Sequence, residues 1–545
     1  MVRRFLLLVL AIASLAGATR AANATAGQLA GIVTSDAEGP MEGVLVSAKQ
    51  SPGTITVTVV SDSKGRFTFP PGRLAPGKYL LSIRAIGYEA AEENIPVAVG
   101  KGKREKNLKL HKTQDLASQL SDVEWLMSVP GTEQQKEYLF LTCSQCHTLA
   151  PVMKSTYDAA GWMVTLTRMN TWDQISKIDK PVKNPDRRGG GMLGNKEFAE
   201  YLSSINLSAH ATNNFELKTL PRPHGADTKV IVTEYDLPRH DAEPHDVSPD
   251  KSGRIWYSDF LEGIIGRLNA ATGEVKEWQD PVTKAGYPSA FQCLEWDPQG
   301  NLWVGRHNWN GIAKFDVKAE RFTDFNIPSG RADFISVGRD GTVWVKDTAS
   351  DFDYRIDPMT GEPTKFNQLP DEFMNKKYEG PRHHPYGITA DANGNLYEAD
   401  ISGGDLYRVE GATGKVSRFT PPTPNSGPRR MHLDSENRVW IGEYYAKTIA
   451  VFDPKTEKFQ EWPIPVPWYG PYDVVADKQG NVWAGGMTSE LIVRLDPKTG
   501  EFRKYLLPRL GVNVRRVEVD NTGARPVLWV GENHQAKIAK VETLD

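Results

Sequence analysis

Short runs in which apolar and polar residues alternate, separated by Gly and Pro, fill residues 27–111. Leu29 to Val33, Val44 to Ala48 and Tyr79 to Ile83 are examples. A period of two residues is that of a strand with one buried face, and frequent turns indicate antiparallel pairing. The pattern predicts a small antiparallel β-sandwich.

A different spacing begins near residue 115 and continues to about residue 212, where apolar residues recur three or four positions apart. Examples surround Trp125, Trp162 and Tyr201. This spacing predicts α-helices, and residues 180–195, rich in Pro, Gly and charge, predict a loop between two of them. We therefore expect a small helical domain at 115–212.

From residue 229 onward the sequence repeats itself. Each unit carries an apolar run, a turn of the type Asp-x-x-Gly-Asn, an aliphatic residue and then an aromatic one. The aromatics are Trp256, Trp303, Trp344, Tyr397, Trp440, Trp483 and Trp529. Four short strands per unit, repeated seven times, predict a seven-bladed β-propeller over 229–545. The seventh repeat lacks an outer strand, and residues 229–238 resemble one, so this segment is expected to close the ring.

The first residues have the pattern of an export signal. Arg3 and Arg4 precede an apolar stretch from Phe5 to Leu15, and small residues then offer cleavage sites up to residue 24. The apolar stretch is shorter than the ~20 residues that a membrane span needs, which disfavours the alternative of an uncleaved anchor. We expect a signal peptide at 1–24 and a periplasmic or secreted bacterial protein with no transmembrane segment in the mature chain.

Composition disfavours one class of partner and one class of scaffold. The formal charge of −3 over 545 residues provides no electrostatic footprint for nucleic acid. Only 3 Cys are present, which disfavours a disulfide scaffold.

Two of those cysteines form a motif, Cys143-Ser144-Gln145-Cys146-His147. This C-x-x-C-H pattern is typical of covalent haem c attachment. Thiols three residues apart lie about one helical turn from each other, and the adjacent imidazole can bind the iron. A local disulfide or half of a zinc site is the alternative, but no second Cys pair completes a zinc site. Cys293, in an apolar strand, is expected to be a buried apolar residue.

Two of these blocks resemble known families. "GQLAGIVTSDAEGPMEGVLVSAK" and "LAPGKYLLSIRAIGYE" resemble the carboxypeptidase regulatory-like domain, which implies a transthyretin-like β-sandwich acting as a non-catalytic spacer or adhesive module. "EYLFLTCSQCHTL" and "EFAEYLSSINL" resemble the cytochrome c domain. That resemblance implies a Met as the sixth iron ligand, either Met169 or Met192, with His210 or an open position as alternatives.

Many titratable side chains are expected to converge at one end of the propeller channel, where they would form a site or simply a wet channel mouth. They are His245, Asp246, Asp259, Arg306, His307, Asp347, His383, His384, Asp400, Arg429, Arg430, His432, Glu443, Tyr472, Glu532 and His534.

The strings "PYGITADANGNLYEAD" and "PYDVVADKQGNVWAGG" resemble the virginiamycin B lyase family of seven-bladed propellers. The resemblance implies opening of a macrocyclic lactone by elimination, with Mg²⁺, His and Glu on the channel face. The matching positions are His245, Glu532 and His534. The Trp-Phe-Thr-Glu string common in that family is absent, so the repeat indicates the fold more strongly than the chemistry.

The sequence as a whole therefore predicts a multidomain, mainly β protein with a β-sandwich, a cytochrome c domain and a propeller. The favoured function is electron transfer by covalent haem, with a redox partner protein or small-molecule substrate at the propeller. A metal-assisted lyase and a non-catalytic binding or adhesion protein are the alternatives. Pyrroloquinoline quinone is not expected, because its propellers usually have eight blades and a different Trp-Gly repeat.

Overall fold

A computed structural model of the chain describes residues 27–173, 175–177, 180–184, 195–282, 289–307, 311–328, 332, 334–347, 352–368 and 385–545. The predicted signal peptide (1–24), Met192, His383 and His384 lie outside the described residues. The chain divides into two compact units, which we treat separately. Unit 1 comprises residues 1–116, 221–235 and 541–545, and unit 2 comprises residues 117–220 and 236–540.

Unit 1 contains the predicted β-sandwich. Its strands are β1 (Gln28–Ser35), β2 (Gly39–Pro40), β3 (Leu45–Gln50), β4 (Ile55–Val60), β5 (Arg66–Thr68), β6 (Gly77–Arg84), β7 (Tyr88–Ala90), β8 (Ile95–Val99), β9 (Lys103–Glu105), β10 (Leu108–Lys112) and β11 (Val230–Asp236), with a 3₁₀ turn at Gly225–Thr228. One sheet has the order β2-β1-β10-β7, with β5 and β9 also paired to β1. The other has the order β4-β3-β6-β8, and β11 adds to it antiparallel, with Ile231 opposite Val59.

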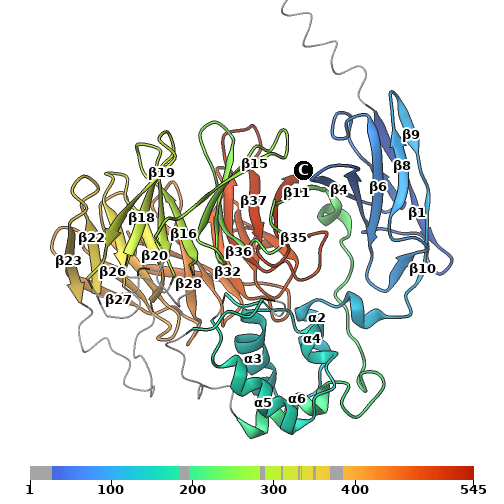
Figure 1. The fold of residues 1–545 in the computed structure, drawn as a ribbon, viewed down its shortest axis with the longest axis horizontal. Helices are drawn as coiled ribbons and strands as arrows, with labels where there is room; N and C mark the ends of the chain where they lie inside the picture. Colours follow the sequence, from blue (N-terminus) through green and yellow to red (C-terminus); the bar gives the residue numbers. More distant parts are fainter. Residues whose placement is uncertain are drawn as a thin grey trace, which may run out of the picture. The chain divides into compact units, whose positions relative to one another are not determined.

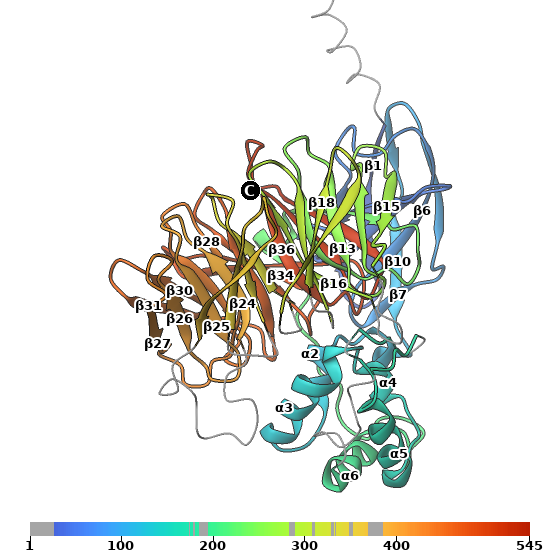
Figure 2. The same cartoon turned by 60° about the vertical axis from the view of Figure 1, so that its left-hand side comes forward.

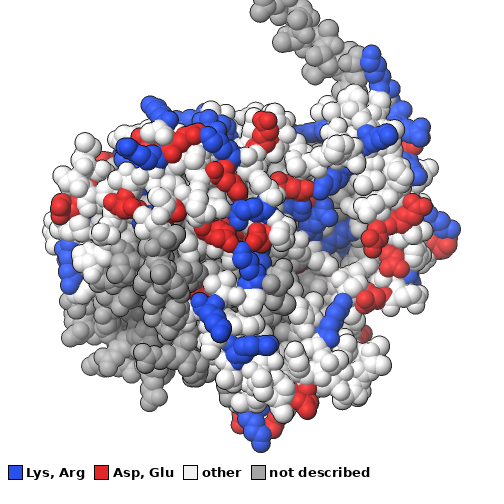
Figure 3. All heavy atoms as spheres, viewed as in Figure 1, with Lys and Arg blue, Asp and Glu red and all other residues white. Residues whose placement is uncertain are grey.

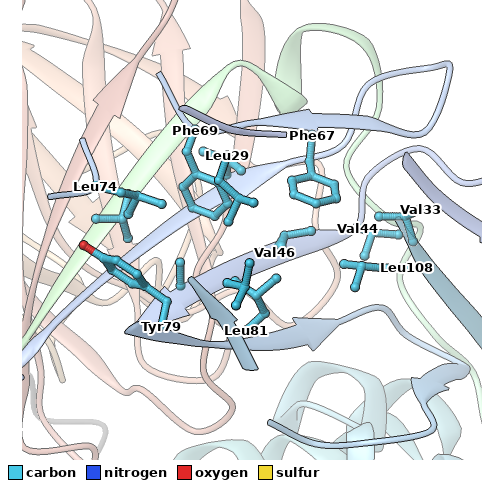
Figure 4. Close-up of a cluster of buried hydrophobic side chains, with 14 of the residues drawn as sticks. Leu29, Val33, Val44, Val46, Phe67, Phe69, Leu74, Tyr79, Leu81 and Leu108 are labelled. Carbon is cyan, nitrogen blue, oxygen red and sulfur yellow. The ribbon is translucent and has the colours of Figure 1, made fainter. Parts of the chain in front are cut away.

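The inward positions of the two sheets form one apolar core. Leu29, Val46, Phe67 and Leu81 are fully buried and point toward one another in Figure 4. The alternation of buried and exposed residues along β8 and β10 matches the period-two pattern of the sequence. The β-sandwich prediction is confirmed.

Unit 2 contains the propeller strands. Among the described residues they form six four-stranded antiparallel sheets and the strands of a seventh. The bounds are β12 (Pro244–Pro249), β13 (Ile255–Asp259), β14 (Ile264–Leu268), β15 (Val275–Gln279); β16 (Phe291–Trp296), β17 (Leu302–Arg306), β18 (Gly311–Asp316), β19 (Arg321–Asn326); β20 (Phe334–Val337), β21 (Val343–Lys346), β22 (Phe352–Ile356), β23 (Pro363–Gln368); β24 (Pro385–Ala390), β25 (Leu396–Asp400), β26 (Leu406–Val409), β27 (Val416–Phe419); β28 (Pro428–Leu433), β29 (Val439–Glu443), β30 (Thr448–Asp453), β31 (Lys458–Pro463); β32 (Pro471–Ala476), β33 (Val482–Gly486), β34 (Leu491–Asp496), β35 (Glu501–Leu506); and β36 (Val514–Asp520), β37 (Val527–Glu532), β38 (Lys537–Thr543). These strands appear from green to red in Figure 1.

The segment before the first blade returns to the last repeat, as predicted. The Leu237 N–H donates to the Ala536 carbonyl at 2.9 Å, and Lys537 pairs with Asp236. Pairing of the two ends of the propeller sequence covers the strand edges that an open array would leave exposed.

The repeated turn aspartate has a structural role. Asp477 Oδ1 accepts the N–H groups of Gln479 and Asn481, and its Oδ2 accepts the Trp483 Nε1–H at 2.9 Å. Equivalent aspartate–tryptophan hydrogen bonds occur at Asp250–Trp256, Asp297–Trp303 and Asp434–Trp440. In these four blades one carboxylate holds both the turn and the buried indole, which explains why the aspartate lies six residues before the tryptophan in each of them.

The helical segment belongs to unit 2. Its helices are η2 (Leu116–Gln119), α2 (Asp122–Ser128), α3 (Glu133–Thr142), η3 (Cys143–Gln145), α4 (Ala150–Met153), α5 (Ala159–Met169) and α6 (Lys196–Ile205). Capping boxes at Ser121 and Thr132 start α2 and α3. Helices α3 and α6 meet where Tyr138 and Phe198 place their ring centroids 4.3 Å apart. Figure 2 shows α2 to α6 gathered in one group.

Two surface properties complete the description. No helix among the described residues combines the length and apolar character needed to cross a membrane. On the face drawn in Figure 3, positive and negative side chains are interspersed. This agrees with the small net charge.

Candidate functional site

Within unit 2 the helical segment contacts the propeller through aromatic rings. Phe140 of α3 stacks on Tyr444, which follows β29, with centroids 4.9 Å apart. Phe140 also lies 6.0 Å from Trp468. Gly470 leaves the space for this contact, since a Cβ there would lie 2.5 Å from the Tyr444 ring and 2.9 Å from Phe140. The contact therefore requires glycine at position 470.

A second contact lies beside the first two blades. Ile175 is fully buried in an apolar cluster with Phe260, Leu261 and Ala290. Two ion pairs flank the cluster: Asp173 with His307 at 3.2 Å, and Lys180 with Asp241 at 2.7 Å. The helical segment thus contacts several blades near the ends of their second strands, where the sequence predicted the channel face.

Between the helical segment and the propeller lies a narrow pocket. Its lining residues are Asp122, His147 and Thr148 from the helical segment and Met487, Thr488, Glu490, Gly511, Asn513 and His534 from the propeller. Gly511 adopts φ +65°, and a Cβ there would lie 2.5 Å from the Thr148 side chain. Glycine therefore permits both the turn and the close approach.

His147 is oriented by its own backbone neighbour. Its Nδ1 lies 2.7 Å from the Thr148 carbonyl oxygen, so Nδ1–H is the donor and Nε2 is left as the nitrogen able to bind a metal. Burial lowers the pKa of His147, which favours the neutral ring. A neutral imidazole held in this way is the form in which histidine binds iron.

The two motif cysteines lie where α3 ends. Cys143 caps α3 and begins the 3₁₀ turn that leads to Cys146, and neither of them forms a disulfide. Burial raises the pKa of Cys143 to about 12. Two thiols and one imidazole on consecutive turns fit the donor set of covalent haem. The pocket beside them has no room even for a water molecule in this structure, so it does not accommodate a porphyrin as it stands.

His534 reaches the same pocket from the end of the seventh repeat. Burial lowers its pKa well below the usual value, and the nearby positive or ionisable groups Arg515, Lys177 and His147 lower it further. Among the described residues, neither ring nitrogen of His534 has a hydrogen-bond partner; only its backbone N–H is bonded, to Val512. The ring is therefore neutral and not held by other side chains.

Two carboxyl groups complete the pocket. Asp122 Oδ1 accepts the Leu149 N–H at 2.7 Å, and Glu490 Oε1 accepts the Gly511 N–H at 2.8 Å. Burial raises the pKa of Asp122 well above its usual value, and the nearby Glu490 carboxylate raises it further. The pocket thus combines two imidazoles with a carboxyl group that resists ionisation.

His245, predicted as catalytic, lies fully buried and is held on both sides. Its Nδ1 is 2.7 Å from Asp246 Oδ1, and its Nε2 is 3.1 Å from the Tyr472 hydroxyl. Burial lowers the pKa of His245 to about 3, against the opposing effect of Asp246. The neutral ring therefore serves as a fixed hydrogen-bonding partner in this structure.

Asp246 is the centre of a buried charge network. Arg430 donates to both of its carboxylate oxygens, at 2.8 and 3.0 Å, and Arg516 donates to Oδ2 at 3.0 Å. Burial alone would raise the pKa of Asp246, but Arg430 and Arg516 outweigh it and hold the pKa well below its usual value. The network joins strands β12, β28 and β36 of three blades.

The other predicted channel residues mostly have structural partners. Arg429 lies over the rings of Tyr386, Tyr444 and Tyr472, at 4.2 to 4.5 Å from their centroids. The remaining pairs are Asp259 with Arg239, Arg306 with Asp280, His307 with Asp173, His432 with Asp473, Glu443 with Ser426, and Asp400 with the N–H groups of Ser402 and Gly403. Asp347 is fully buried after β21.

The structure brings only part of the predicted site together. His147 and His534 share the pocket, whereas His245 and Glu532 are fully buried and do not line it. Met169 ends α5 and also does not line it. His210 is exposed after α6. Cys293 is buried as expected, with burial raising its pKa to about 12, although its sulfur also accepts a hydrogen bond from Arg430.

Magnesium remains a prediction. Among the described residues, no group of three or more His, Cys, Asp or Glu side chains is arranged to hold a metal ion.

Sequence reasoning missed the pocket residue Met487, together with Asp122 and Asn513. The repeat carries no signal for Met487. Trp440 and Trp529 are followed after one residue by a Gly-Glu pair, but the other five repeats, that of Trp483 included, all lack this pair.

Comparisons with known proteins support two of the three resemblances. The sequence profile of the Virginiamycin B lyase family matches residues 371–544, and that of the carboxypeptidase regulatory-like domain matches residues 28–111. This chain carries a virginiamycin B lyase-like β-propeller and a carboxypeptidase regulatory-like domain.

Solved structures agree on the fold. Virginiamycin B lyase from Staphylococcus aureus, 19% identical, covers 58% of this chain and 100% of its own, with a TM-score of 0.51. A streptogramin B lyase, 20% identical, covers 58% of this chain and 99% of its own, with a TM-score of 0.52. At these identities the similarity shows the fold alone.

Curated relatives match over shorter stretches. The quinoprotein alcohol dehydrogenase PedE of Pseudomonas putida is 28% identical over 200 residues, covering 32% of this chain and 28% of PedE. The photosystem II assembly lipoprotein Ycf48 of Prochlorococcus marinus is 32% identical over 56 residues, covering 10% of this chain and 16% of that protein. The chain thus spans less than a third of the length of these relatives.

Proposed function

We propose that this chain is an exported c-type haem protein. Haem is attached through Cys143 and Cys146, its iron is bound by His147, and the propeller binds a substrate or a redox partner. Covalently attached haem supplies a one-electron Fe(III)/Fe(II) couple. The observation that carries the proposal is the C-x-x-C-H motif at the end of α3, with His147 oriented so that Nε2 is available.

The surroundings of the motif support this assignment over a disulfide or a zinc site. Helix α3, which ends at the motif, packs against α6 where the rings of Tyr138 and Phe198 meet, so the motif lies in the helical setting that the sequence predicted. The third cysteine, Cys293, lies buried in β16 beside Arg430 and is not part of the motif. The two motif thiols therefore remain for thioether bonds to the porphyrin.

One relative bears on the role of the propeller. PedE, of which this chain covers 28%, is a quinoprotein alcohol dehydrogenase, so a propeller that binds a substrate or cofactor is the coarser expectation that this similarity supports. The lyase-type propeller would then serve as the binding platform, since one fold hosts many functions. The carboxypeptidase regulatory-like domain of unit 1 would act as a spacer or adhesive module.

Mass spectrometry of the full chain tests the proposal. The protein is produced in a bacterial host that has the c-type haem attachment machinery, and its proteolytic peptides are analysed. We expect haem on the peptide containing Cys143 and Cys146, and a visible spectrum that changes reversibly with reductant and oxidant. Two alkylatable thiols in the native protein would overturn the proposal.

The cysteines provide matched controls. The double variant Cys143→Ala/Cys146→Ala should lose all covalent haem, whereas Cys293→Ala should retain the full amount. Haem retained by the double variant would show that attachment does not use the motif.

A second candidate function is a lyase reaction, favoured by one observation. His534 lies in the region matched by the Virginiamycin B lyase family and lines the pocket with a neutral ring. A catalytically inactive histidine-to-alanine form of the Staphylococcus aureus enzyme is known with quinupristin. A neutral histidine can act as a general base at a carbon next to a carbonyl group.

The partners of His245 disfavour it as that base, because both ring nitrogens are engaged. The lyase hypothesis therefore depends on His534. Incubation of the full chain with streptogramin B antibiotics should yield the linear product, and His534→Ala should abolish the reaction. If no product forms with the unsubstituted chain, this candidate function is wrong.

A further inference from the structure

We infer that the loop between Thr171 and Asn184 is a latch that closes the channel end of the first two blades. The latch comprises the described residues 171–173, 175–177 and 180–184. It has to open before a ligand reaches the polar groups beneath it. The inference goes beyond the proposed function, because it concerns access to the propeller and requires no haem.

The latch is a compact loop held by its own hydrogen bonds. The Asp173 N–H donates to the Val182 carbonyl at 2.7 Å, and the Asn184 N–H donates to the Thr171 carbonyl at 3.1 Å. Asn184 Nδ2 also donates to Asp173 Oδ2 at 2.6 Å. Because these bonds lie within the loop, the latch keeps its shape when its contacts with the blades break.

The contacts between the latch and the blades consist of one apolar anchor and several charge pairs. Ile175 is fully buried against Phe260, Leu261 and Ala290, and the blade residues in the charge pairs lie at the same end of the first two blades. The charge pairs are Asp173 with His307 at 3.2 Å, Lys177 with Glu243 at 3.6 Å, and Lys180 with both Asp241 and Glu262.

These contacts favour a closed position that is reversible. The side chains of Lys180, Asp241 and Glu262 are 38%, 22% and 41% exposed. Exposed ion pairs add little stability and weaken as salt screens them. Separation of the buried pair of Asp173 and His307 returns both groups to water, which offsets the lost attraction. A single isoleucine therefore supplies most of the lasting contact.

Polar groups of the channel end lie beneath the latch. Phe260, which packs against the latch, has its ring centroid 4.7 Å from that of His245 and 4.6 Å from the Arg515 guanidinium carbon. Gln292, two residues after Ala290, is 3% exposed, and its Oε1 has no hydrogen-bond partner among the described atoms. A buried acceptor without a donor is costly. Opening of the latch gives this oxygen access to a ligand that donates a hydrogen bond.

Hydrogen exchange of the full chain at two salt concentrations tests the latch. The Phe260 N–H donates to the Glu243 carbonyl and the His307 N–H to the Ala290 carbonyl, and both bonds lie beneath the latch. We expect peptides containing these amides to exchange several-fold faster in about 1 M than in about 0.01 M sodium chloride, because salt screens the charge pairs. Peptides of β26 should exchange at the same rate in both. Equal rates for the Phe260 and His307 peptides would overturn the inference.

Charge reversal provides the second arm. Lys180→Glu places a third negative charge beside Asp241 and Glu262, so the same peptides should exchange faster at low salt. Lys180→Arg should keep the slow exchange of the unsubstituted chain. Lys196→Glu is the matched control, since it makes the same change in charge on α6 at a side chain that is 82% exposed. Slow exchange in Lys180→Glu at low salt would overturn the inference.

Failure of the inference can be distinguished from failure of the proposed function. The salt series uses the unsubstituted chain, so it decides the inference even where a variant does not fold. If mass spectrometry finds no haem on Cys143 and Cys146, the proposed function is wrong, and the salt series still decides whether the latch opens. If haem is attached and exchange does not respond to salt, only the inference is wrong.

Discussion

Two polar regions of unit 2, one fully buried and one partly buried, differ in how completely their groups are paired. In the first, around Asp246, two arginines and one histidine donate to a single carboxylate, and each partner comes from a different strand. In the second, the pocket of His147 and His534, one imidazole is bonded only through Nδ1 and the other is not bonded through its ring.

This difference in pairing distinguishes a region that stabilises the fold from a region that could bind a ligand. A buried charge network in which the donors and acceptors are matched fixes the arrangement of blades and leaves no group available for a ligand. The sequence placed Asp246 and His534 on one channel face and did not place His147 there. In the structure the paired Asp246 network is distinct from the pocket, where His147 and His534 each keep a ring nitrogen that bonds to no described residue.

The largest expected effect on stability follows from loss of the Asp246 charge. Asp246→Asn keeps the side-chain shape but leaves Arg430 and Arg516 buried without their counter-ion. We expect the free energy of unfolding of unit 2 to fall by about 3–5 kcal/mol, measured by chemical denaturation. Glu501→Gln, at a glutamate whose side chain is 66% exposed, should change it by less than about 0.5 kcal/mol. A small effect of Asp246→Asn would remove the structural role assigned to this network.

Acid should destabilise the same region through His245. Because its pKa is lowered to about 3 in the folded protein, the unfolded chain takes up a proton that the folded chain does not once pH falls below about 6.5. Above about pH 6.5 His245 therefore does not change the free energy of unfolding with pH. Below it, His245 lowers the free energy of unfolding by about 1.4 kcal/mol per pH unit, down to about pH 3. His245→Asn should therefore reduce the slope of unfolding free energy against pH by one proton.

His432 provides the opposite case in the same region. Burial would lower its pKa, but Asp473 outweighs burial and raises it. Its stabilising contribution is complete below about pH 6.5 and is lost as pH rises through the folded pKa. His432→Asn should remove a decline in stability on the alkaline side. Equal pH profiles for both variants would contradict the assigned protonation states.

A smaller effect is expected at the contact between the helical segment and the propeller. In Gly470→Ala the new Cβ lies within 3 Å of the Tyr444 and Phe140 rings, so the rings have to separate at a cost of about 1–3 kcal/mol. Gly523→Ala is the matched control, since the nearest atom to its Cβ is 3.4 Å away. Hydrogen exchange of α3 amides should increase in Gly470→Ala and not in the control.

The repeats could be predicted because their determinants are local. Asp477 bonds to groups two, four and six residues further on, so one turn motif indicates one blade wherever it occurs. The alternating pattern of the sandwich is local in the same sense. Both predictions were confirmed, and the comparisons support both domains.

The site depends on contacts between distant residues, and here the sequence was less informative. His245 and Tyr472 are 227 residues apart, and Asp173 and His307 are 134 apart. Residue type alone did not reveal that His245 is held on both sides while His534 is not. The C-x-x-C-H motif could be recognised because Cys143, Cys146 and His147 lie within five residues of one another, whereas its propeller neighbours Met487 and His534 carry no such pattern.

The smallest expected effect on the free energy of unfolding is at Asp122. This residue can be compared directly with Asp246, because both are buried aspartates. Asp122 has no arginine partner among the residues that the structure describes, and burial followed by repulsion from Glu490 raises its pKa well above the usual value. Because its pKa is raised, Asp122 causes no loss of stability below about pH 4. The free energy of unfolding then declines as pH rises toward the pKa of Asp122 in the folded protein. Asp122→Asn keeps an oxygen for the Leu149 N–H and removes that decline. We expect the free energy of unfolding to be unchanged within about 1 kcal/mol at pH 4 and to exceed that of the unsubstituted chain at pH 7. A loss at pH 7 as large as that of Asp246→Asn would mean that the pocket carboxyl is paired as tightly as the central one, and the contrast between the two regions would not hold.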